Sequence, residues 1–255
     1  KAAEDKQRML NEQLEVTNQE LQEANASKDK FFSIIAHDLR SPFNWLIGLT
    51  QVILENIENY TKEDIQKIIG QLHASTNKVY DLLTNLLAWS RFQRGLMEHN
   101  PESVALEDIA EHNIQLFSSG AEQKQITLRH SVPKGTEVYA DHNMVDTVIR
   151  NLISNALKFT GADGVIEVSA QAHDEMIEVA VSDTGIGMSK ENQARLFRID
   201  IKYISVGTAG EKGSGLGLLL CKELVETNGG TLWVESEKGE GTTFRFTLPQ
   251  AERQE

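Results

Sequence analysis

The sequence predicts a two-part protein, with a coiled coil and helical hairpin followed by a mixed α/β domain. From Lys1 to about Asn56 nearly every residue tolerates a helix, and apolar positions recur at spacings of four and three. A second amphipathic segment follows, and beyond Pro101 the pattern changes to β-type runs that alternate with helices. The 255 residues, 40% hydrophobic and 25% charged, suffice for two domains with separate cores.

The first helix carries a heptad seam. Its members are Leu10, Leu14, Thr17, Leu21, Ala24, Lys28, Phe31 and Ile35. The early turns are polar outside this seam, which is typical of a two-stranded coiled coil that leads into a thicker bundle. Because the Pro42 ring interrupts helix hydrogen bonds, we expect a kink near residues 37–41.

A second helix begins at Thr61, where Asp64 completes a capping box, and ends near Gly95. Its apolar positions are Ile65, Ile68, Ile69, Leu72, Val79, Leu82, Leu83, Leu86 and Leu87. The short polar segment 56–60 predicts an antiparallel hairpin. Two wide apolar faces are more than one hairpin can bury, so we expect a homodimer with a four-helix bundle.

The second domain is predicted from shorter runs. Strands are expected at 127–132, 138–140, 165–170, 176–182, 231–235 and 243–248, with helices at 143–159 and 216–227. The resulting domain bounds are 1–29 for the coiled coil, 30–98 for the hairpin, 102–250 for the α/β domain and 251–255 for a tail.

Charge and cysteine content exclude several classes of protein. A net charge of −13 opposes nucleic acid and anionic membrane surfaces as partners. The single cysteine, Cys221, excludes an internal disulfide and a cysteine-based zinc cluster, and indicates a reducing compartment. No stretch reaches the ~20 apolar residues of a membrane span. Since the chain starts at Lys1 inside a helix, we expect a longer protein with a sensor domain upstream.

Two polar motifs point to a phosphate-containing ligand. On the helix at 143–159, Asn151, Asn155 and Lys158 share one face, so two amide oxygens and an ammonium could serve a metal-bound phosphate chain. A solvated polar face is the alternative. Asp183 emerges at the end of a strand, and the glycines that follow let a flat ligand approach the backbone closely. A tight turn is the alternative there.

A third motif, residues 213–217, opens the helix at 216–227 with three glycines. Its exposed amides and the helix dipole favour a phosphate, and Lys212 adds positive charge. A Rossmann site is disfavoured because this loop does not follow a strand.

Together these motifs resemble the N, G1 and G2 boxes of the ATP-binding (Bergerat-type) fold shared by histidine kinases, Hsp90 chaperones, DNA gyrase and MutL. Phe197 resembles the F box, and residues 239–244 resemble the last glycine-plus-threonine element. Residues 31–42, with His37 followed by Asp38 and Pro42, resemble the H box of sensor histidine kinases. The resemblance therefore implies a dimerisation and phosphotransfer hairpin joined to an α/β sandwich ATP-binding domain.

The resemblance also implies residue roles. His37 would be the phosphoacceptor, Asp38 would hold its other ring nitrogen, and Ser41 would orient a hydrolytic water or merely ease the kink. Asn155 would bind Mg²⁺, and Asp183 the adenine amino group. The full implied nucleotide set is Asn151, Asn155, Lys158, Asp183, Gly185, Ile186, Gly187, Phe197, Lys212, Gly213, Ser214, Gly215, Leu216, Gly217 and Thr242. Residues 188–212 would form a mobile lid.

The implied function is ATP-dependent autophosphorylation on His37, followed by transfer to an aspartate of a response regulator receiver domain. We expect a cytoplasmic location, with membrane anchoring through an upstream segment left open. Two alternatives are an adaptor whose nucleotide domain only regulates conformation and a chaperone-like or mismatch-repair-like ATPase. Intact N and G boxes argue against the adaptor, and the H box argues against the ATPase.

Overall fold

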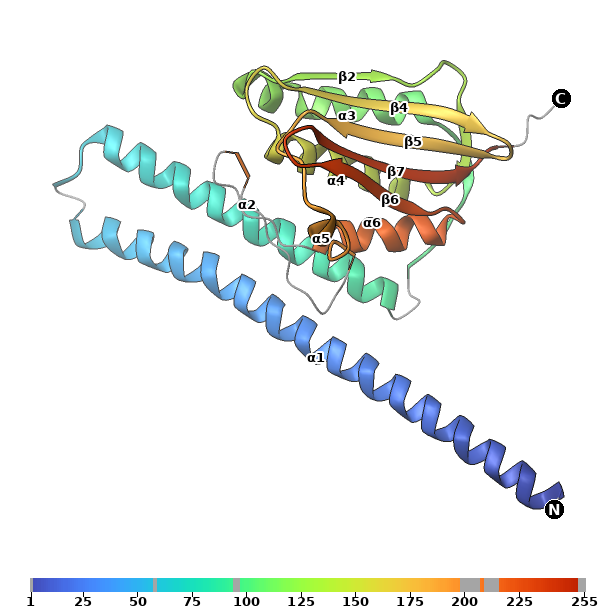
Figure 1. Cartoon of the computed structure of the whole chain (residues 1–255). Helices are drawn as coiled ribbons and strands as arrows, with labels where there is room; N and C mark the ends of the chain where they lie inside the picture. The colour runs from blue at the N-terminus through green and yellow to red at the C-terminus, as the bar shows by residue number, and fades with distance from the viewer. Residues whose placement is uncertain (1, 57–58, 94–96, 198–206, 209–215, 252–255) are drawn as a thin grey trace. The chain divides into compact units, whose positions relative to one another are not determined.

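In the computed structural model, the described residues are 2–56, 59–93, 97–197, 207–208 and 216–251. The chain begins with two long helices, α1 (Ala2–Asn56) and α2 (Lys62–Gln93), and continues into an α/β domain (Figure 1). It divides into two compact units, whose boundary lies between Leu82 and Leu83, within α2. The predicted fold class, a helical part followed by an α/β sheet domain, is therefore confirmed.

The helical unit shows the expected hairpin and its capping box. The Thr61 amide donates to Asp64 Oδ2 at 3.2 Å, and the Asp64 amide donates to Thr61 Oγ1 at 3.2 Å. Helix α1 continues through Pro42, whose carbonyl accepts a 3.3 Å hydrogen bond from Ser75 of α2. The kink near residues 37–41 stays a prediction.

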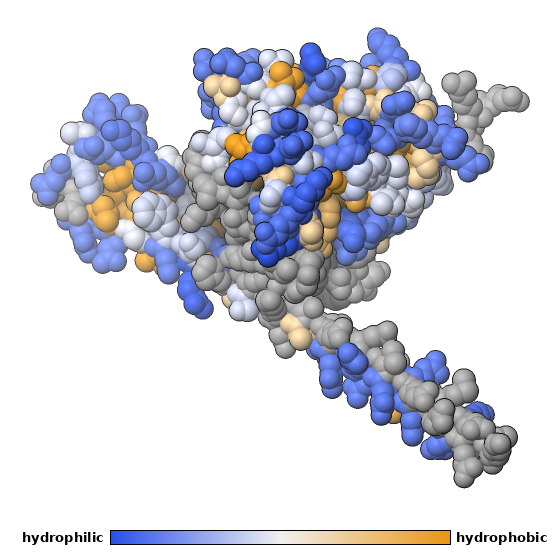
Figure 2. Space-filling view, viewed as in Figure 1, coloured by the Kyte–Doolittle hydropathy of each residue, from blue (hydrophilic) through white to orange (hydrophobic). Residues whose placement is uncertain are grey.

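Much of the apolar surface of this unit is uncovered. Only a few of its described side chains, among them Ile35, Val79 and Leu82, are buried. The exposed large apolar residues are Leu10, Leu14, Leu21, Phe43, Trp45, Ile47, Val52, Leu54, Ile69 and Tyr80. Figure 2 shows apolar surface around the end of the hairpin. Within the part of the chain that the structure describes, no helix is long and apolar enough to cross a bilayer.

A five-stranded sheet in the order β2-β4-β5-β7-β6 forms the second unit. Its strands are β2 (Thr127–Ser131), β4 (Val165–His173), β5 (Met176–Asp183), β6 (Leu232–Glu237) and β7 (Gly241–Pro249). The β2–β4 pair is parallel, and the other pairs are antiparallel. A smaller antiparallel pair joins β1 (Glu102–Ala105) to β3 (Glu137–Ala140).

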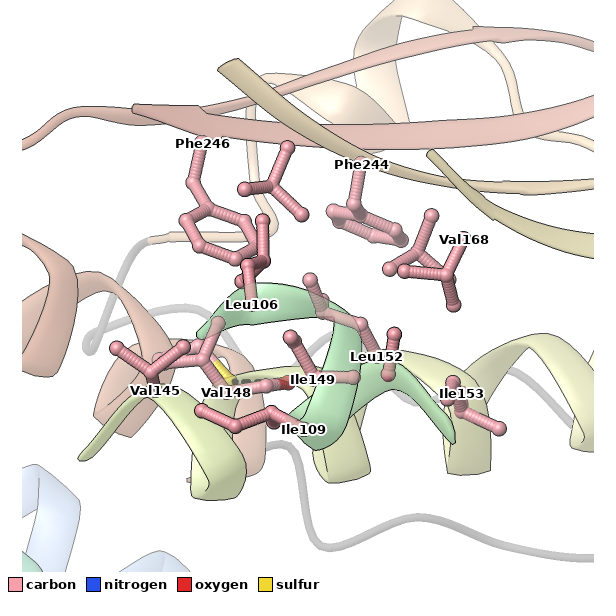
Figure 3. Close-up of a cluster of buried hydrophobic side chains, with 14 of the residues drawn as sticks. Leu106, Ile109, Val145, Val148, Ile149, Leu152, Ile153, Val168, Phe244 and Phe246 are labelled. Atoms are coloured by element: carbon pink, nitrogen blue, oxygen red, sulfur yellow. Dashed lines mark hydrogen bonds between the residues drawn. The ribbon is translucent and has the colours of Figure 1, made fainter. Parts of the chain in front are cut away.

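One face of the sheet is covered by α3 (Leu106–Gln123), α4 (His142–Phe159) and α6 (Leu216–Thr227) (Figure 1). The core lies between sheet and helices, where Phe244 and Phe246 meet the apolar face of α4 (Figure 3). Cys221 is buried in this core, as expected for a small apolar side chain, and burial raises the pKa of its thiol to about 12.

The predicted strands and helices of this unit are confirmed, with ends that shift by a few residues. The sequence pattern predicts no element over residues 102–126, whereas the structure has β1 and α3 there. Helix α5 (Lys190–Gln193) was also missed. In α3 the polar residue Asn113 occupies the buried face, where its amide donates to Ile109 O and to Asp146 Oδ1.

Candidate active site

Asp183 is the last residue of β5 and pairs with Thr242 of β7. Its Oδ1 accepts a 2.8 Å hydrogen bond from the Gly185 amide, and the Thr242 amide also donates to its carboxyl group. Burial nevertheless dominates and raises the pKa of Asp183 from 3.8 to about 6. The carboxyl group is thus partly desolvated while it still has acceptor capacity for a ligand.

Glycine is required around this carboxyl group because backbone segments pass very close to one another. A Cβ atom on Gly185 would lie 2.4 Å from Phe159 O, and one on Gly241 would lie 2.0 Å from Asp183 O. Gly241 also has a φ of +111°, a conformation that L side chains rarely adopt. The glycines following Asp183 and preceding Thr242 therefore serve close backbone approach, and the tight-turn alternative explains only part of their placement.

The polar stripe of α4 runs along one edge of its core face. Asn151, Asn155 and Lys158 are half-buried, whereas the neighbouring Leu152 and Ile153 are completely buried. The Lys158 ammonium lies 4.6 Å from the centroid of the Phe159 ring. The three side chains thus border the core and remain partly accessible.

The start of α6 packs against this stripe. A Cβ atom on Gly217 would lie 3.0 Å from Asn151 Oδ1, so glycine lets the helix approach the asparagine closely. The Asn151 amide nitrogen donates to Thr147 O at 3.0 Å, which fixes the side-chain orientation. The third glycine of the 213–217 motif therefore lies beside the first residue of the α4 stripe.

Backbone hydrogen bonds join the Asp183 loop to the α4 helix. The Ile186 amide donates to Phe159 O at 3.2 Å, and the Gly239 amide donates to Ile186 O at 2.8 Å. The Ile186 side chain is 46% exposed, so it remains available to a ligand. Motifs from α4, from the β5 end and from the β6–β7 turn therefore converge on one site.

Ser236 and Gln193, which the sequence patterns do not predict as site residues, hold the chain around Met188. Ser236 Oγ accepts from the Met188 amide at 2.9 Å, donates to Gly241 O at 2.7 Å and lies 3.0 Å from Thr242 Oγ1. Gln193 of α5 donates to both Met188 O and Ser236 O, at 3.2 and 2.7 Å. Neither residue belongs to a spacing pattern that the sequence could reveal.

Other predicted site residues are placed only in part. Phe197 is half-buried against the core. Lys212, Gly213, Ser214 and Gly215 lie outside the described residues, and of Leu216 only its position at the start of α6 is described. His37 lies in α1 but its side chain is outside the described part, while Asp38 is half-buried and Ser41 is exposed one turn later. His37 and the nucleotide motifs therefore belong to different units of the chain.

The donor set fits Mg²⁺ only if a ligand supplies most of the coordination. Among the described residues, no three His, Cys, Asp or Glu side chains group as a metal site. Asn155 offers one half-buried amide oxygen beside Lys158 on the same stripe. Mg²⁺ commonly takes few protein ligands and completes its octahedron with phosphate oxygens and water, so this arrangement is compatible with a phosphate-bound ion.

Two family descriptions match the chain. Residues 27–95 match the His Kinase A (phospho-acceptor) domain, and residues 140–252 match the histidine kinase-, DNA gyrase B- and HSP90-like ATPase. The chain belongs to the sensor histidine kinases. Its α/β unit is accordingly an ATP-binding domain, and the resemblance read from the N, G1 and H boxes is confirmed.

Two curated proteins are similar to the chain over most of its length. The kinase is 35% identical over 231 residues to the "Non-motile and phage-resistance protein" of Caulobacter vibrioides, covering 89% of this chain and 27% of that protein. It is 31% identical over 246 residues to the "Adaptive-response sensory kinase SasA" of Crocosphaera subtropica, covering 92% of this chain and 63% of that protein. The chain thus spans less than two thirds of either relative.

A solved structure shares the fold of this kinase. It is the crystal structure of histidine kinase ThkA in complex with response regulator protein TrrA. The match covers 88% of this chain and 62% of that chain, with a TM-score of 0.66 and 20% sequence identity. At that identity the likeness extends to the fold alone.

We predict that Asp183→Asn changes how the stability of the nucleotide-free kinase depends on pH. Because the folded-state pKa lies above 3.8, ionising Asp183 opposes folding, and its favourable contribution at low pH is lost as pH rises through about 6. The free energy of unfolding of Asp183→Asn minus that of the native protein should therefore grow by about 2–3 kcal/mol between pH 4 and 7.5.

Urea unfolding of the α/β unit at several pH values measures this difference. Asp174→Asn, in the exposed β4–β5 turn, is the matched control for loss of a carboxylate. If the two variants show the same pH dependence, the proposed burial of a charged Asp183 is wrong.

Proposed function

We propose that this chain uses ATP to phosphorylate His37 and then passes the phosphoryl group to an aspartate of a response regulator receiver domain. The observation that supports this most is the convergence of three motifs in one unit. The buried Asp183 carboxyl group, the Asn151–Lys158 stripe and the Gly217 end of α6 meet around one site. A phosphoacceptor helix carrying His37 precedes them in the chain.

In this proposal the adenine and the phosphates of ATP, and the accompanying metal ion, each have a chemical partner. The Asp183 carboxylate accepts a hydrogen bond from the adenine amino group, a charged acceptor worth roughly 1.5–3 kcal/mol. Lys158 and the amides at the start of α6 contact the phosphates, because an ammonium and a helix N-terminus both favour anions. Asn155 would hold Mg²⁺, which would offset the negative charge of the phosphates.

Transfer to His37 requires little covalent chemistry from the other residues. A neutral imidazole nitrogen attacks the γ-phosphorus, the bond to the β–γ bridging oxygen breaks, and ADP leaves. Positive charge develops on the ring, and Asp38 accepts a hydrogen bond from the other ring nitrogen and stabilises it. In the second step, a carboxylate of the regulator attacks the same phosphorus and frees the histidine.

The partners of this chain are part of the proposal. We infer a response regulator as partner because phosphohistidine can donate its phosphoryl group to a carboxylate, and because ThkA, which has the same fold, was solved in complex with the response regulator TrrA. A second copy of the chain would cover the exposed apolar faces of α1 and α2. A cytoplasmic location is also part of the proposal. Ser41, exposed one turn after His37, would orient a water molecule that hydrolyses the phosphorylated regulator.

We predict that His37→Gln still binds ATP but takes up no phosphoryl group, because the nucleophile is lost while the nucleotide unit is unchanged. The measurement is incubation with γ-labelled ATP, and the native label should be acid-labile and base-stable, as expected for a phosphoramidate. His73→Gln, on the exposed face of α2, is the matched control and should label normally. Label only in free phosphate would indicate an ATPase, and no turnover would indicate an adaptor.

We predict that the chain is a dimer at micromolar concentration, because the exposed Leu14 and Leu21 extend the heptad seam of α1. Light scattering should give twice the chain mass of 28.5 kDa. Leu14→Lys together with Leu21→Lys should weaken the dimer by placing like charges in the seam. A native mass of 28.5 kDa would contradict the bundle.

We predict that Ser41→Ala slows dephosphorylation of the regulator severalfold and leaves autophosphorylation nearly unchanged, because only the hydrolytic water depends on its hydroxyl group. The decay of purified phosphorylated regulator is measured with native protein, with Ser41→Ala and with neither. Should native protein fail to speed the decay, the role of Ser41 is wrong. A parallel loss of both activities would instead indicate altered helix geometry before Pro42.

A further inference from the structure

The last carbonyl groups of α4 and the residue after it are hydrogen-bonded by groups distant in sequence. Lys124 Nζ donates to Leu157 O at 2.8 Å. The Thr208 amide donates to Lys158 O at 2.9 Å, and its hydroxyl lies 3.2 Å from Lys158 O and 3.0 Å from Thr160 O. Together with the Ile186 amide on Phe159 O, these bonds satisfy four successive carbonyls.

The carbonyl groups at the end of a helix do not always have hydrogen-bond partners. The last four carbonyls of an α-helix have no partner within the helix, and a loosely held last turn frays easily. In α4 the last turn carries Lys158, the cation of the polar stripe. The order of this turn therefore determines how well the ammonium group is positioned.

Thr208 and Lys124 form a connected pair. Lys124 Nζ lies 3.3 Å from Thr208 Oγ1, so the ammonium donates to the hydroxyl while the hydroxyl donates to a backbone carbonyl. Successive donors of this kind polarise one another, and a cation at a helix C-terminus also interacts favourably with the helix dipole. The pair is called the Thr208 anchor below.

We propose that the Thr208 anchor is a positioning device for the nucleotide phosphates, acting through Lys158. The inference depends on the proposed phosphate contact of Lys158 and adds two residues that no motif contains. Thr208 contacts α4 through its amide and its hydroxyl, and Lys124 reaches the same turn from the end of α3. Neither residue needs to touch the nucleotide.

The anchor also fixes one end of the chain that leads to α6. Thr208 is held at the C-terminal end of α4, and Gly217 is held beside Asn151 on the same helix. In the sequence, Lys212 and the other motif residues before α6 lie between these two attachment points. Helix α4 thus sets both attachment points of that segment, as well as the position of Lys158.

The test is a double-mutant cycle on the full-length chain, read as the dissociation constant for a nonhydrolysable ATP analogue with Mg²⁺. Thr208→Val removes the hydroxyl group but keeps the side-chain volume, and it should weaken binding about tenfold through the loss of the hydroxyl bonds. Thr208→Ser keeps the hydroxyl group and should bind within about twofold of native. Thr136→Val, which removes one hydroxyl–carbonyl bond in a turn before β3, is the matched control and should bind as native.

Action through Lys158 predicts non-additivity. In a Lys158→Met background, Thr208→Val should raise the dissociation constant by less than about twofold, because the ammonium group that Thr208 positions is already absent. Lys124→Met approaches the anchor from its other side and should show the same dependence on Lys158, which keeps the test informative if Thr208→Val folds poorly.

The outcomes separate this inference from the proposed function. If Lys158→Met alone leaves the affinity unchanged, the phosphate role of Lys158 is wrong, and the inference fails with it. If Lys158→Met weakens binding but Thr208→Val does not, or if the two effects add fully, the anchor is merely structural and only the inference is overturned.

Discussion

The burial of one face of α4 is the constraint on which the rest of the α/β unit depends. Val145, Val148, Ile149, Leu152 and Ile153 fill the space beneath the sheet (Figure 3), and each fully buried side chain contributes roughly 1.5–3 kcal/mol. Rotating the helix by one residue, about 100°, would expose this face. Packing of this face therefore also orients the adjacent stripe of Asn151, Asn155 and Lys158, so these side chains project from a rigid, close-packed element.

The Asp183 end of the site is positioned differently, because it depends on the close approach of backbone segments to one another. Antiparallel pairing sets Asp183 against Thr242, and Gly185 and Gly241 allow the surrounding chain to close around the carboxyl group. This closure removes water, which raises the pKa of Asp183 and makes its ionised form unfavourable in the empty site. A ligand that donates a hydrogen bond to the carboxylate offsets the cost of burying its charge. The same burial therefore lowers the stability of the empty site and favours ligands that carry such a donor.

The sequence predicts those features that repeat along the chain or follow a fixed spacing. The periodicity of α1, α2 and α4, the Thr61–Asp64 capping box and the glycine motifs all belong to that class. Helix α3 also has apolar residues at helical spacing, yet Asn113 interrupts its buried face and is acceptable only because Asp146 of α4 accepts its hydrogen bond. Ser236, Lys124 and Thr208 act as single side chains on distant backbone groups, so their roles depend on tertiary placement that no local pattern records.

The segment that follows α2 shows how far the α/β unit extends along the chain. The Asn100 amide donates to Asp141 Oδ2 at 3.0 Å, and Asp141 itself caps the N-terminus of α4 by accepting from the Met144 amide. His99 Nε2 lies 3.2 Å from the Oδ1 atom of the buried Asn228, and Met97 packs against the core. These contacts make the segment part of the same rigid packing as the nucleotide site. Helix α4 is therefore held at its N-terminus by this segment and at its C-terminus by Lys124 and Thr208.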